Sequence, residues 1–147
     1  MIPVHEVMST APVTVTPMTS LEDLLTLFDR HDYNAFPVLG QDGRLAGIVS
    51  KLDILRLFVT VDARSWSVEA GVCVADVMQR KVVSAGGEDD ILDAGTLMIV
   101  TKRCSVPVVQ AREPRPRLIG MLSRGDVLRG LRFQLERSKP QTSEAAA

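Results

Sequence analysis

The chain has few of the residues from which metal sites and disulfides are built. It holds two cysteines and two histidines among 147 residues. Cys73, Cys104, His5 and His31 are far apart in sequence and form no CxxC or Cys/His cluster. A structural zinc site takes about four ligands, so we predict no metal site. We expect each cysteine to be a small, half-buried apolar residue in a reducing cytosol.

Excess positive charge and long apolar runs are also missing. The formal net charge is −1, whereas nucleic-acid binding usually requires a basic patch, so we expect no nucleic-acid partner. No run approaches the roughly 18 apolar residues of a membrane helix. The first ten residues show no basic stretch followed by an apolar one. We therefore expect a cytoplasmic protein without a membrane partner.

Catalytic signatures are absent as well. The sequence contains neither a GxxxxGK[ST] nor a GxGxxG segment, which leaves Walker-type hydrolysis and Rossmann binding unsupported. The run His31-Asp32-Tyr33 stands beside no nucleophile with a recognisable elbow or glycine-rich frame. We therefore predict that the chain is not an enzyme and needs no catalytic cofactor.

The sequence instead contains two copies of one unit. A shift of 70 residues aligns the first half with the second until the turn at 41–44, after which the shift is 73. The matched pairs include Val4/Val74, Met8/Met78, Val13/Val83, Asp23/Asp93, Pro37/Pro107, Gly47/Gly120, Ser50/Ser123 and Asp53/Asp126. Internal repeats of this kind define the architecture before any single motif does.

Each copy has the pattern β-α-β-β-α after a short helical turn. Ser20 and Asp90 are placed to cap the first helix of their copies, and strands are expected over 35–39, 45–49, 105–109 and 118–122. We predict a mixed α+β fold with repeat 1 at 1–59, a linker at 60–72, repeat 2 at 73–136 and a disordered tail at 137–147. A single unit of this size buries little surface, so we expect two sheets that share a core, with Trp66 of the linker packed against them.

A Gly-x-x-Ser-x-x-Asp segment occurs in both copies, where a buried strand runs into a helix. It places Ser50 and Asp53, and again Ser123 and Asp126, at a helix N-terminus. A carboxylate there can accept hydrogen bonds from both hydroxyls of a ribose, and free N–H groups can hold a phosphate. The same residues form a capping box, and capping alone would account for either copy in isolation.

Together with Glu6-Val7-Met8, Asp76-Val77-Met78 and the Pro37 and Pro107 strands, these segments make residues 3–136 resemble the cystathionine-β-synthase (CBS) pair, or Bateman, family. The resemblance implies a regulatory module with two clefts between the repeats. Each cleft would bind an adenosyl ligand: AMP, ADP, ATP or S-adenosylmethionine. A scaffold protein that binds no ligand and serves dimerisation is the alternative.

The resemblance also implies that each cleft combines residues of both repeats. The residues carried over to cleft A are Ser50, Asp53, Val82, Val83, Arg103, Cys104 and Ser105. Those carried over to cleft B are Pro12, Val13, Tyr33, Asn34, Ala35, Ser123 and Asp126. We expect cleft A to be the better phosphate site, because Lys102 and Arg103 stand where cleft B has Asp32 and Tyr33.

Two expectations concern assembly. The apolar stripes of Leu24, Leu27 and Phe28, and of Leu55 and Phe58, exceed what one shared core needs and predict a homodimer. An unidentified regulated protein is a further possible partner. The arginines of the 111–117 loop, Arg112, Arg115 and Arg117, are expected to lie in a solvated turn, with a docking site for a partner as the alternative.

Overall fold

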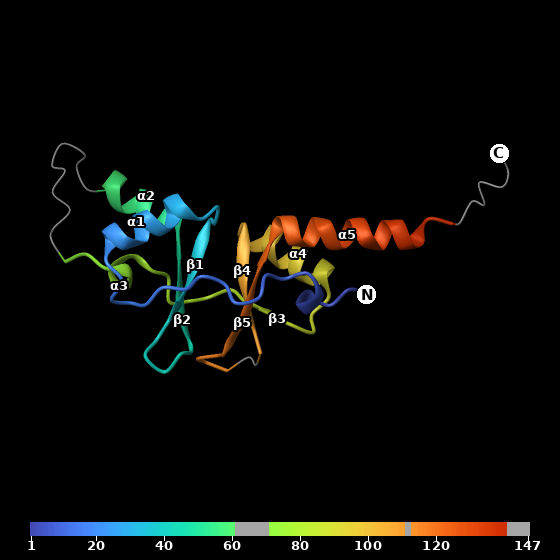
Figure 1. Ribbon diagram of the computed structural model, residues 1–147, viewed down its shortest axis with the longest axis horizontal. Coiled ribbons are helices and arrows are strands. Elements are labelled where there is room, and N and C mark those ends of the chain that lie inside the picture. Colours follow the sequence, from blue (N-terminus) through green and yellow to red (C-terminus); the bar gives the residue numbers. More distant parts are fainter. Residues whose placement is uncertain (61–70, 111–112, 141–147) are drawn as a thin grey trace.

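The protein, a computed structural model, is described over residues 1–60, 71–110 and 113–140, and its elements follow the two repeats in order (Figure 1). The first repeat contains η1 (Val4–Glu6), α1 (Leu21–Arg30), β1 (Ala35–Leu39), β2 (Leu45–Ser50) and α2 (Lys51–Thr60). The second contains α3 (Val74–Val77), β3 (Ala85–Gly86), α4 (Ile91–Thr101), β4 (Ser105–Val109), β5 (Leu118–Ser123) and α5 (Arg124–Ser138). The predicted mixed fold of two repeats is confirmed.

The two sheets are built alike. Strands β1 and β2 are antiparallel, as are β4 and β5, and the register shifts within β1 and β4 at equivalent places. In repeat 2 the short β3 lies parallel to β4. In repeat 1 its place is taken by a single parallel bridge between Val15 and Val38. In each copy the extended residues that precede the first long helix, α1 or α4, therefore lie beside the first strand of the hairpin as a third position of the sheet.

Capping side chains start the first helix of each repeat. The backbone N–H of Asp23 donates to Ser20 Oγ at 3.1 Å, and that of Leu92 donates to Asp90 Oδ1 at 3.4 Å. Both predicted caps are confirmed, and each satisfies an N–H group that the helix leaves unpaired. At the other end of the chain α5 continues to Ser138, so residues 137 and 138 are helical and not part of a tail. Residues 141–147 lie outside the described part.

The opening segments of the two repeats are exchanged in space. The segment that contains η1 pairs with repeat 2, through bridges from Pro3 to Asp90 and from Ser9 to Met121. The segment that contains α3 pairs with repeat 1, through the equivalent bridges from Cys73 to Ser20 and from Gln79 to Ile48. Figure 1 shows the result: η1 lies beside α4 and α5, and α3 lies beside α1.

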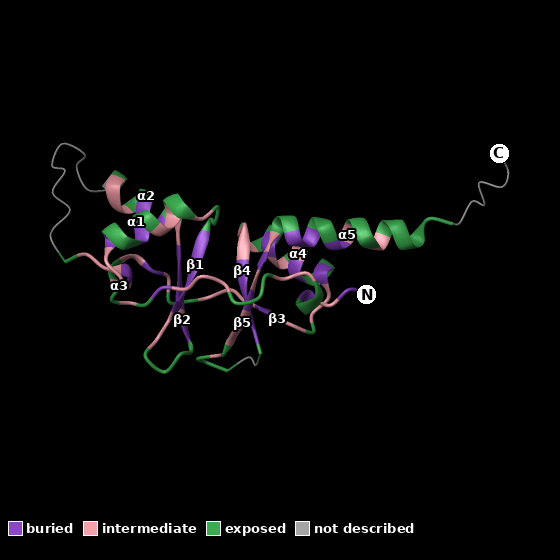
Figure 2. Cartoon of the chain, viewed as in Figure 1, coloured by how far each residue is buried: buried purple, intermediate pink, exposed green. Residues whose placement is uncertain are grey.

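This exchange corrects the expectation of one shared core. The buried apolar residues form two clusters, one in each half of the molecule (Figure 2). The cluster of repeat 2 includes Ile2 and Val4 from the first segment of the chain. The cluster of repeat 1 includes Val74 and Met78 from the segment after the linker. Each repeat therefore completes the core of the other, which ties their stabilities together.

The hairpin loops of the two repeats meet and exchange ion pairs. Arg44 Nη1 lies 3.1 Å from Glu113 Oε2, and Arg115 Nη2 lies 3.0 Å from Asp42 Oδ2. The backbone N–H of Leu45 donates to the carbonyl of Pro116 at 2.9 Å. Arg115 thus contributes to contact between the repeats. Arg112 of the same loop, and Trp66 of the linker, lie outside the described residues.

Candidate functional site

The repeated Ser-x-x-Asp segments form capping boxes at the N-termini of α2 and α5. The backbone N–H groups of Ser50 and Ser123 donate to Asp53 Oδ2 and Asp126 Oδ2, each at 2.8 Å. In return the N–H groups of the two aspartates donate to the serine Oγ atoms at 3.2 Å. Capping therefore accounts for one oxygen of each carboxylate. The second oxygen, Oδ1, distinguishes the two copies. In Asp53 it accepts a hydrogen bond from Gln79, which follows α3, and in Asp126 it accepts one from Arg129 of its own helix.

The glycine that opens each segment has a steric reason that sequence reasoning did not supply. A Cβ atom at Gly47 would lie 2.7 Å from the carbonyl oxygen of Gln79, and one at Gly120 would lie 2.7 Å from that of Ser9. Both oxygens belong to the exchanged segments, whose backbones pair with β2 and β5 at Ile48 and Met121. Only glycine leaves room for the exchanged segment to pass this close, so each glycine allows that segment to pair with the strand beside the cleft.

Cleft B is one cavity of about 160 Å³. The structure places all seven residues carried over to it on the wall of this cavity, from Pro12 and Val13 through Tyr33, Asn34 and Ala35 to Ser123 and Asp126. The wall also contains Asp32, which the sequence had placed facing this cleft, and Ser9, Pro37, Ser105 and Met121, which sequence reasoning did not assign to it. Repeat 1 and repeat 2 both contribute, so the crosswise arrangement implied by the family is present.

The carboxylate of Asp126 is the buried polar group of cleft B. Asp126 is only 7% exposed. Its Oδ2 accepts the N–H of Ser123 at 2.8 Å, and its Oδ1 accepts Arg129 Nη2 at 2.7 Å. A carboxylate has about four acceptor positions, and these two bonds leave capacity for two more. The Arg129 side chain is 56% exposed, so it can move without disturbing the core.

An aromatic cluster supports the opposite wall of cleft B. The ring of Tyr33 stacks on His31 at 5.4 Å and meets the buried Phe36 edge-on at 5.5 Å between centroids. These contacts fix the orientation of the Tyr33 ring at the cavity wall. The run His31-Asp32-Tyr33, considered above as a catalytic cluster, is thus an aromatic support with Asp32 on the cavity wall.

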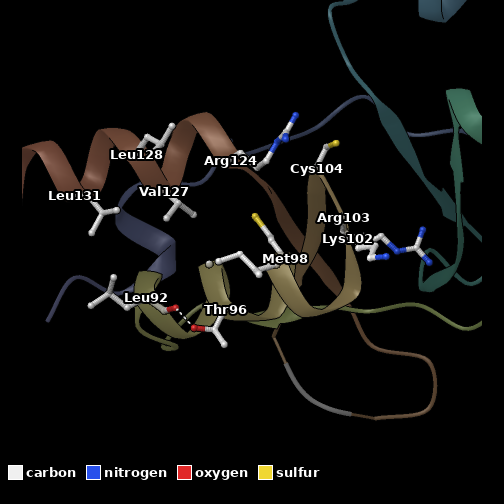
Figure 3. A pocket seen from close by; sticks show the side chains of 12 residues that line it. Leu92, Thr96, Met98, Lys102, Arg103, Cys104, Arg124, Val127, Leu128 and Leu131 are labelled. Carbon is white, nitrogen blue, oxygen red and sulfur yellow. Dashed lines mark hydrogen bonds between the residues drawn. The ribbon is translucent and has the colours of Figure 1, made fainter.

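The residues carried over to cleft A are distributed over several hollows. Val82 and Val83 line a groove that includes Asp89 and Pro116. Arg103 and Cys104 line the groove between α4 and α5, where the guanidinium of Arg103 points away from the leucines of α5 (Figure 3). Ser105 lines cleft B. The loop preceding β4 is therefore shared between surfaces, which its sequence position alone did not indicate.

A glutamine that sequence reasoning missed, Gln79, lies between two of the residues carried over to cleft A. Gln79 Nε2 donates to Asp53 Oδ1 at 2.8 Å, and Arg103 Nη2 donates to Gln79 Oε1 at 2.6 Å. The guanidinium that we expected to await a phosphate is thus hydrogen-bonded within the protein. The signal for Gln79 was its position, 70 residues after Ser9, which is the equivalent place in cleft B.

A short capped helix sets the position of Gln79. The backbone N–H of Cys73 donates to Asp76 Oδ2 at 2.9 Å at the start of α3. This hydrogen bond, with a second from the Cys73 thiol, holds the pKa of Asp76 below its ordinary value, because both favour the ionised carboxylate. The chain leaves α3 at Met78, and Gln79 then pairs with Ile48 of β2 through two backbone hydrogen bonds.

Two further observations apply to the described residues only. Within 1–60, 71–110 and 113–140, no group of three His, Cys, Asp or Glu side chains is arranged to hold a metal ion. In the same ranges, no helix has the length and apolar character that crossing a membrane requires.

Comparison with known proteins identifies the family that shares this architecture. The family model for the CBS domain matches residues 4–60 and again 74–132. The chain belongs to the CBS-domain family. The resemblance drawn from the sequence is therefore confirmed, and so is the pairing of two such repeats.

Relatives of similar organisation occur in distant organisms. MJ1426 of Methanocaldococcus jannaschii is 29% identical, with 82% of this chain and 86% of that protein aligned. The chloroplastic protein CBSX1 of Arabidopsis thaliana is 28% identical, with 84% of this chain and 60% of CBSX1 aligned. The chain thus spans less than two thirds of this plant relative.

Solved structures share the fold over nearly the whole chain. The structure of CBSX2 in complex with AMP has a TM-score of 0.76 at 29% identity and covers 93% of this chain and 100% of that one. The CBS pair of MJ0100, solved with 5′-methylthioadenosine and S-adenosyl-L-methionine, has a TM-score of 0.74 at 20% identity, covering 91% of this chain and 98% of that one. At that identity the second likeness shows the fold alone.

Proposed function

We propose that the chain is a non-catalytic regulatory module that binds an adenosyl ligand in cleft B. The single observation that carries this proposal is the cavity between the repeats, where the carboxylate of the 7% exposed Asp126 lies opposite Pro12, Val13 and Tyr33. A polar anchor that faces apolar and aromatic walls suits a nucleoside, which joins a flat base to a hydroxylated sugar. The complex of CBSX2 with AMP, at 29% identity, supports the ligand class.

The chemistry of the wall assigns a role to each side. The free acceptor capacity of Asp126 receives one ribose hydroxyl in a charge-assisted hydrogen bond, and the hydroxyl of Ser123 forms a neutral hydrogen bond with the other. Pro12, Val13 and the ring of Tyr33 contact the base. The cavity, at about 160 Å³, is below the roughly 300–1,000 Å³ typical of small-molecule sites. The 5′ substituent of the ligand therefore extends towards solvent.

The charge of the wall ranks the adenosyl ligands. Its charged residues are the acids Asp32 and Asp126, and it contains no lysine or arginine among the residues described. Nearby carboxylates oppose added negative charge. We therefore expect affinity to fall from AMP to ATP, and S-adenosylmethionine, whose sulfonium is positive, to bind at least as well as AMP.

Calorimetric titration tests the proposal. The wild-type protein, freed of bound nucleotide by unfolding and refolding, is titrated with AMP, ATP, S-adenosylmethionine and, as a control, GMP. Saturable binding of an adenosyl ligand and none of GMP is the expected result. Absence of binding by all four up to millimolar concentration would favour the scaffold alternative, a module that keeps the fold for dimerisation.

A second copy of the chain is the proposed partner of the helical face. Leu24 is buried, and Leu27, Phe28 and Phe58 pack on the core of repeat 1, so that Leu55, which is 58% exposed, is the one member of the expected stripes left largely exposed. Exposed apolar side chains instead follow α2, α4 and α5: Leu52, Leu55, Val59, Leu92, Ile99, Val100, Leu128, Phe133 and Leu135. Of these, Leu92, Ile99 and Leu128 line an apolar groove of about 600 Å³ between α4 and α5 (Figure 3). Such a surface marks an interface, and two-fold pairing is its commonest form.

The remaining proposals concern the cellular compartment and the regulated partner. Both cysteines are free thiols, which suits a reducing compartment, and we place the protein in the cytosol. A regulated protein that responds to the bound ligand is the expected consequence of a module without chemistry of its own.

A further inference from the structure

The two clefts of the chain are related by the repeat, and one of their differences is the side chain at the equivalent positions Ser9 and Gln79. We infer that the Gln79 side chain blocks cleft A and excludes ligand from it, so that each chain binds one adenosyl ligand, in cleft B. This inference rests on the proposed function. According to this inference, one residue of the exchanged segment determines whether the chain has one ligand-binding site or two.

The backbone geometry makes Ser9 and Gln79 equivalent. Ser9 exchanges two backbone hydrogen bonds with Met121, at 2.9 and 3.0 Å, and Gln79 exchanges two with Ile48, at 2.8 and 2.9 Å. Each follows the short helical turn of its repeat and crosses the glycine of the opposite Gly-x-x-Ser-x-x-Asp segment. The side chains at the two positions therefore start from matching places, and their lengths decide what they reach.

Ser9 is short and exposed, and it lines the open cavity. Gln79 is half-buried, and its amide reaches the carboxylate of Asp53, with Nε2 at 2.8 Å from Oδ1. The other oxygen of Asp53 accepts both the N–H and the hydroxyl of Ser50, at 2.8 and 2.9 Å. Both oxygens of the carboxylate that a ribose would use thus already accept hydrogen bonds from the protein.

Arg103 locks this arrangement from the other side. Its Nη2 donates to Gln79 Oε1 at 2.6 Å, so the amide is held between a carboxylate and a guanidinium. Both hydrogen bonds involve a charged group, which makes them stronger than neutral ones. A ligand entering cleft A must break both. In cleft B Oδ1 of the equivalent carboxylate, Asp126, accepts Arg129 of its own helix, and the position equivalent to Arg103 is Tyr33.

The reciprocal substitutions Gln79→Ser and Ser9→Gln test the inference, because each gives one cleft the residue of the other. AMP is titrated into each variant by calorimetry, with thermal melting as the check on folding. We expect one site per chain in the wild type and two in Q79S. In S9Q we expect the affinity of the remaining site to fall at least tenfold. In Q79S the new site depends on the released guanidinium, so Q79S/R103A loses most of the added AMP binding.

The outcomes separate this inference from the proposed function. Two sites in the wild type, or one site in a folded Q79S, overturns the role of Gln79 and leaves the proposed function standing. If the wild type binds no AMP, the proposed function fails for that ligand. A site gained in Q79S would then still support closure of cleft A by Gln79, and a folded Q79S that gains no site would overturn it.

A measurement on the wild type covers the case in which Q79S does not fold. In a two-dimensional amide spectrum, saturating AMP should shift the backbone signal of Ser9 and leave the side-chain amide of Gln79 in place. A shift of the Gln79 side-chain amide as large as that of Ser9 would show ligand in cleft A and overturn the inference.

Discussion

The carboxylate of Asp126 couples ligand binding to helix capping. The group performs both tasks: its Oδ2 caps α5 at 2.8 Å from the Ser123 nitrogen, and its remaining acceptor positions face cleft B. Asp126→Ala should therefore lose affinity and stability together. A hydrogen bond to a charged group contributes about 1.5–3 kcal/mol, which corresponds to a weakening of AMP binding by about 10- to 150-fold. Loss of the cap costs about 1 kcal/mol of unfolding free energy.

Asp53→Ala is the matched control, because Asp53 forms the same capping box on α2 and is equally buried, at 8% exposure. It should destabilise the protein by a similar amount or more, since the Gln79 amide loses its acceptor, while AMP affinity at cleft B stays within about twofold. Asp126→Asn keeps an acceptor for the Ser123 nitrogen and should retain stability with intermediate affinity. Urea unfolding and calorimetry measure both quantities. Equal loss of AMP affinity in the Asp53 and Asp126 variants would refute the assignment to cleft B.

Three further predictions follow from the contacts. Gly120→Ala should lower the unfolding free energy by about 1–3 kcal/mol, because its Cβ would lie 2.7 Å from the Ser9 carbonyl oxygen. Gly125→Ala, whose Cβ would lie 3.7 Å from the nearest atom, should be neutral or stabilising in urea unfolding. Equal losses of unfolding free energy in the two variants would contradict close backbone approach as the reason for glycine at position 120. Arg103→Ala should leave AMP affinity within about twofold, since its guanidinium serves Gln79; weaker binding of AMP with unchanged binding of adenosine would restore it as a phosphate contact. Leu128→Asp, at a residue 66% exposed, should convert the proposed dimer to monomer in light scattering; a wild-type monomer would refute the proposed interface.

Local signals in the sequence predicted much of this fold. The repeat, the caps at Ser20 and Asp90, and the strand–helix junctions at Ser50 and Ser123 depend on residues near one another in the chain, and each capping bond forms as expected. Cleft B followed from the family resemblance, because its wall is built from segments that the repeat aligns directly.

The features that could not be predicted depend on pairing between distant segments. The exchange of the opening segments places Val4 in the core of repeat 2 and Val74 in that of repeat 1, although apolar periodicity is the same for either partner. For the same reason the sequence did not show that Leu24 and Phe28 are satisfied within their own repeat. Gln79 was overlooked because its role arises from reaching Asp53, 26 residues earlier in the chain.

The most direct test of the account is a crystal structure of the protein grown with AMP. The account predicts one nucleotide per chain, its ribose hydroxyls on Asp126 and Ser123 and its base between Val13 and Tyr33, with Gln79 still bonded to Asp53 and Arg103. A nucleotide on Asp53, with Gln79 displaced, would contradict it.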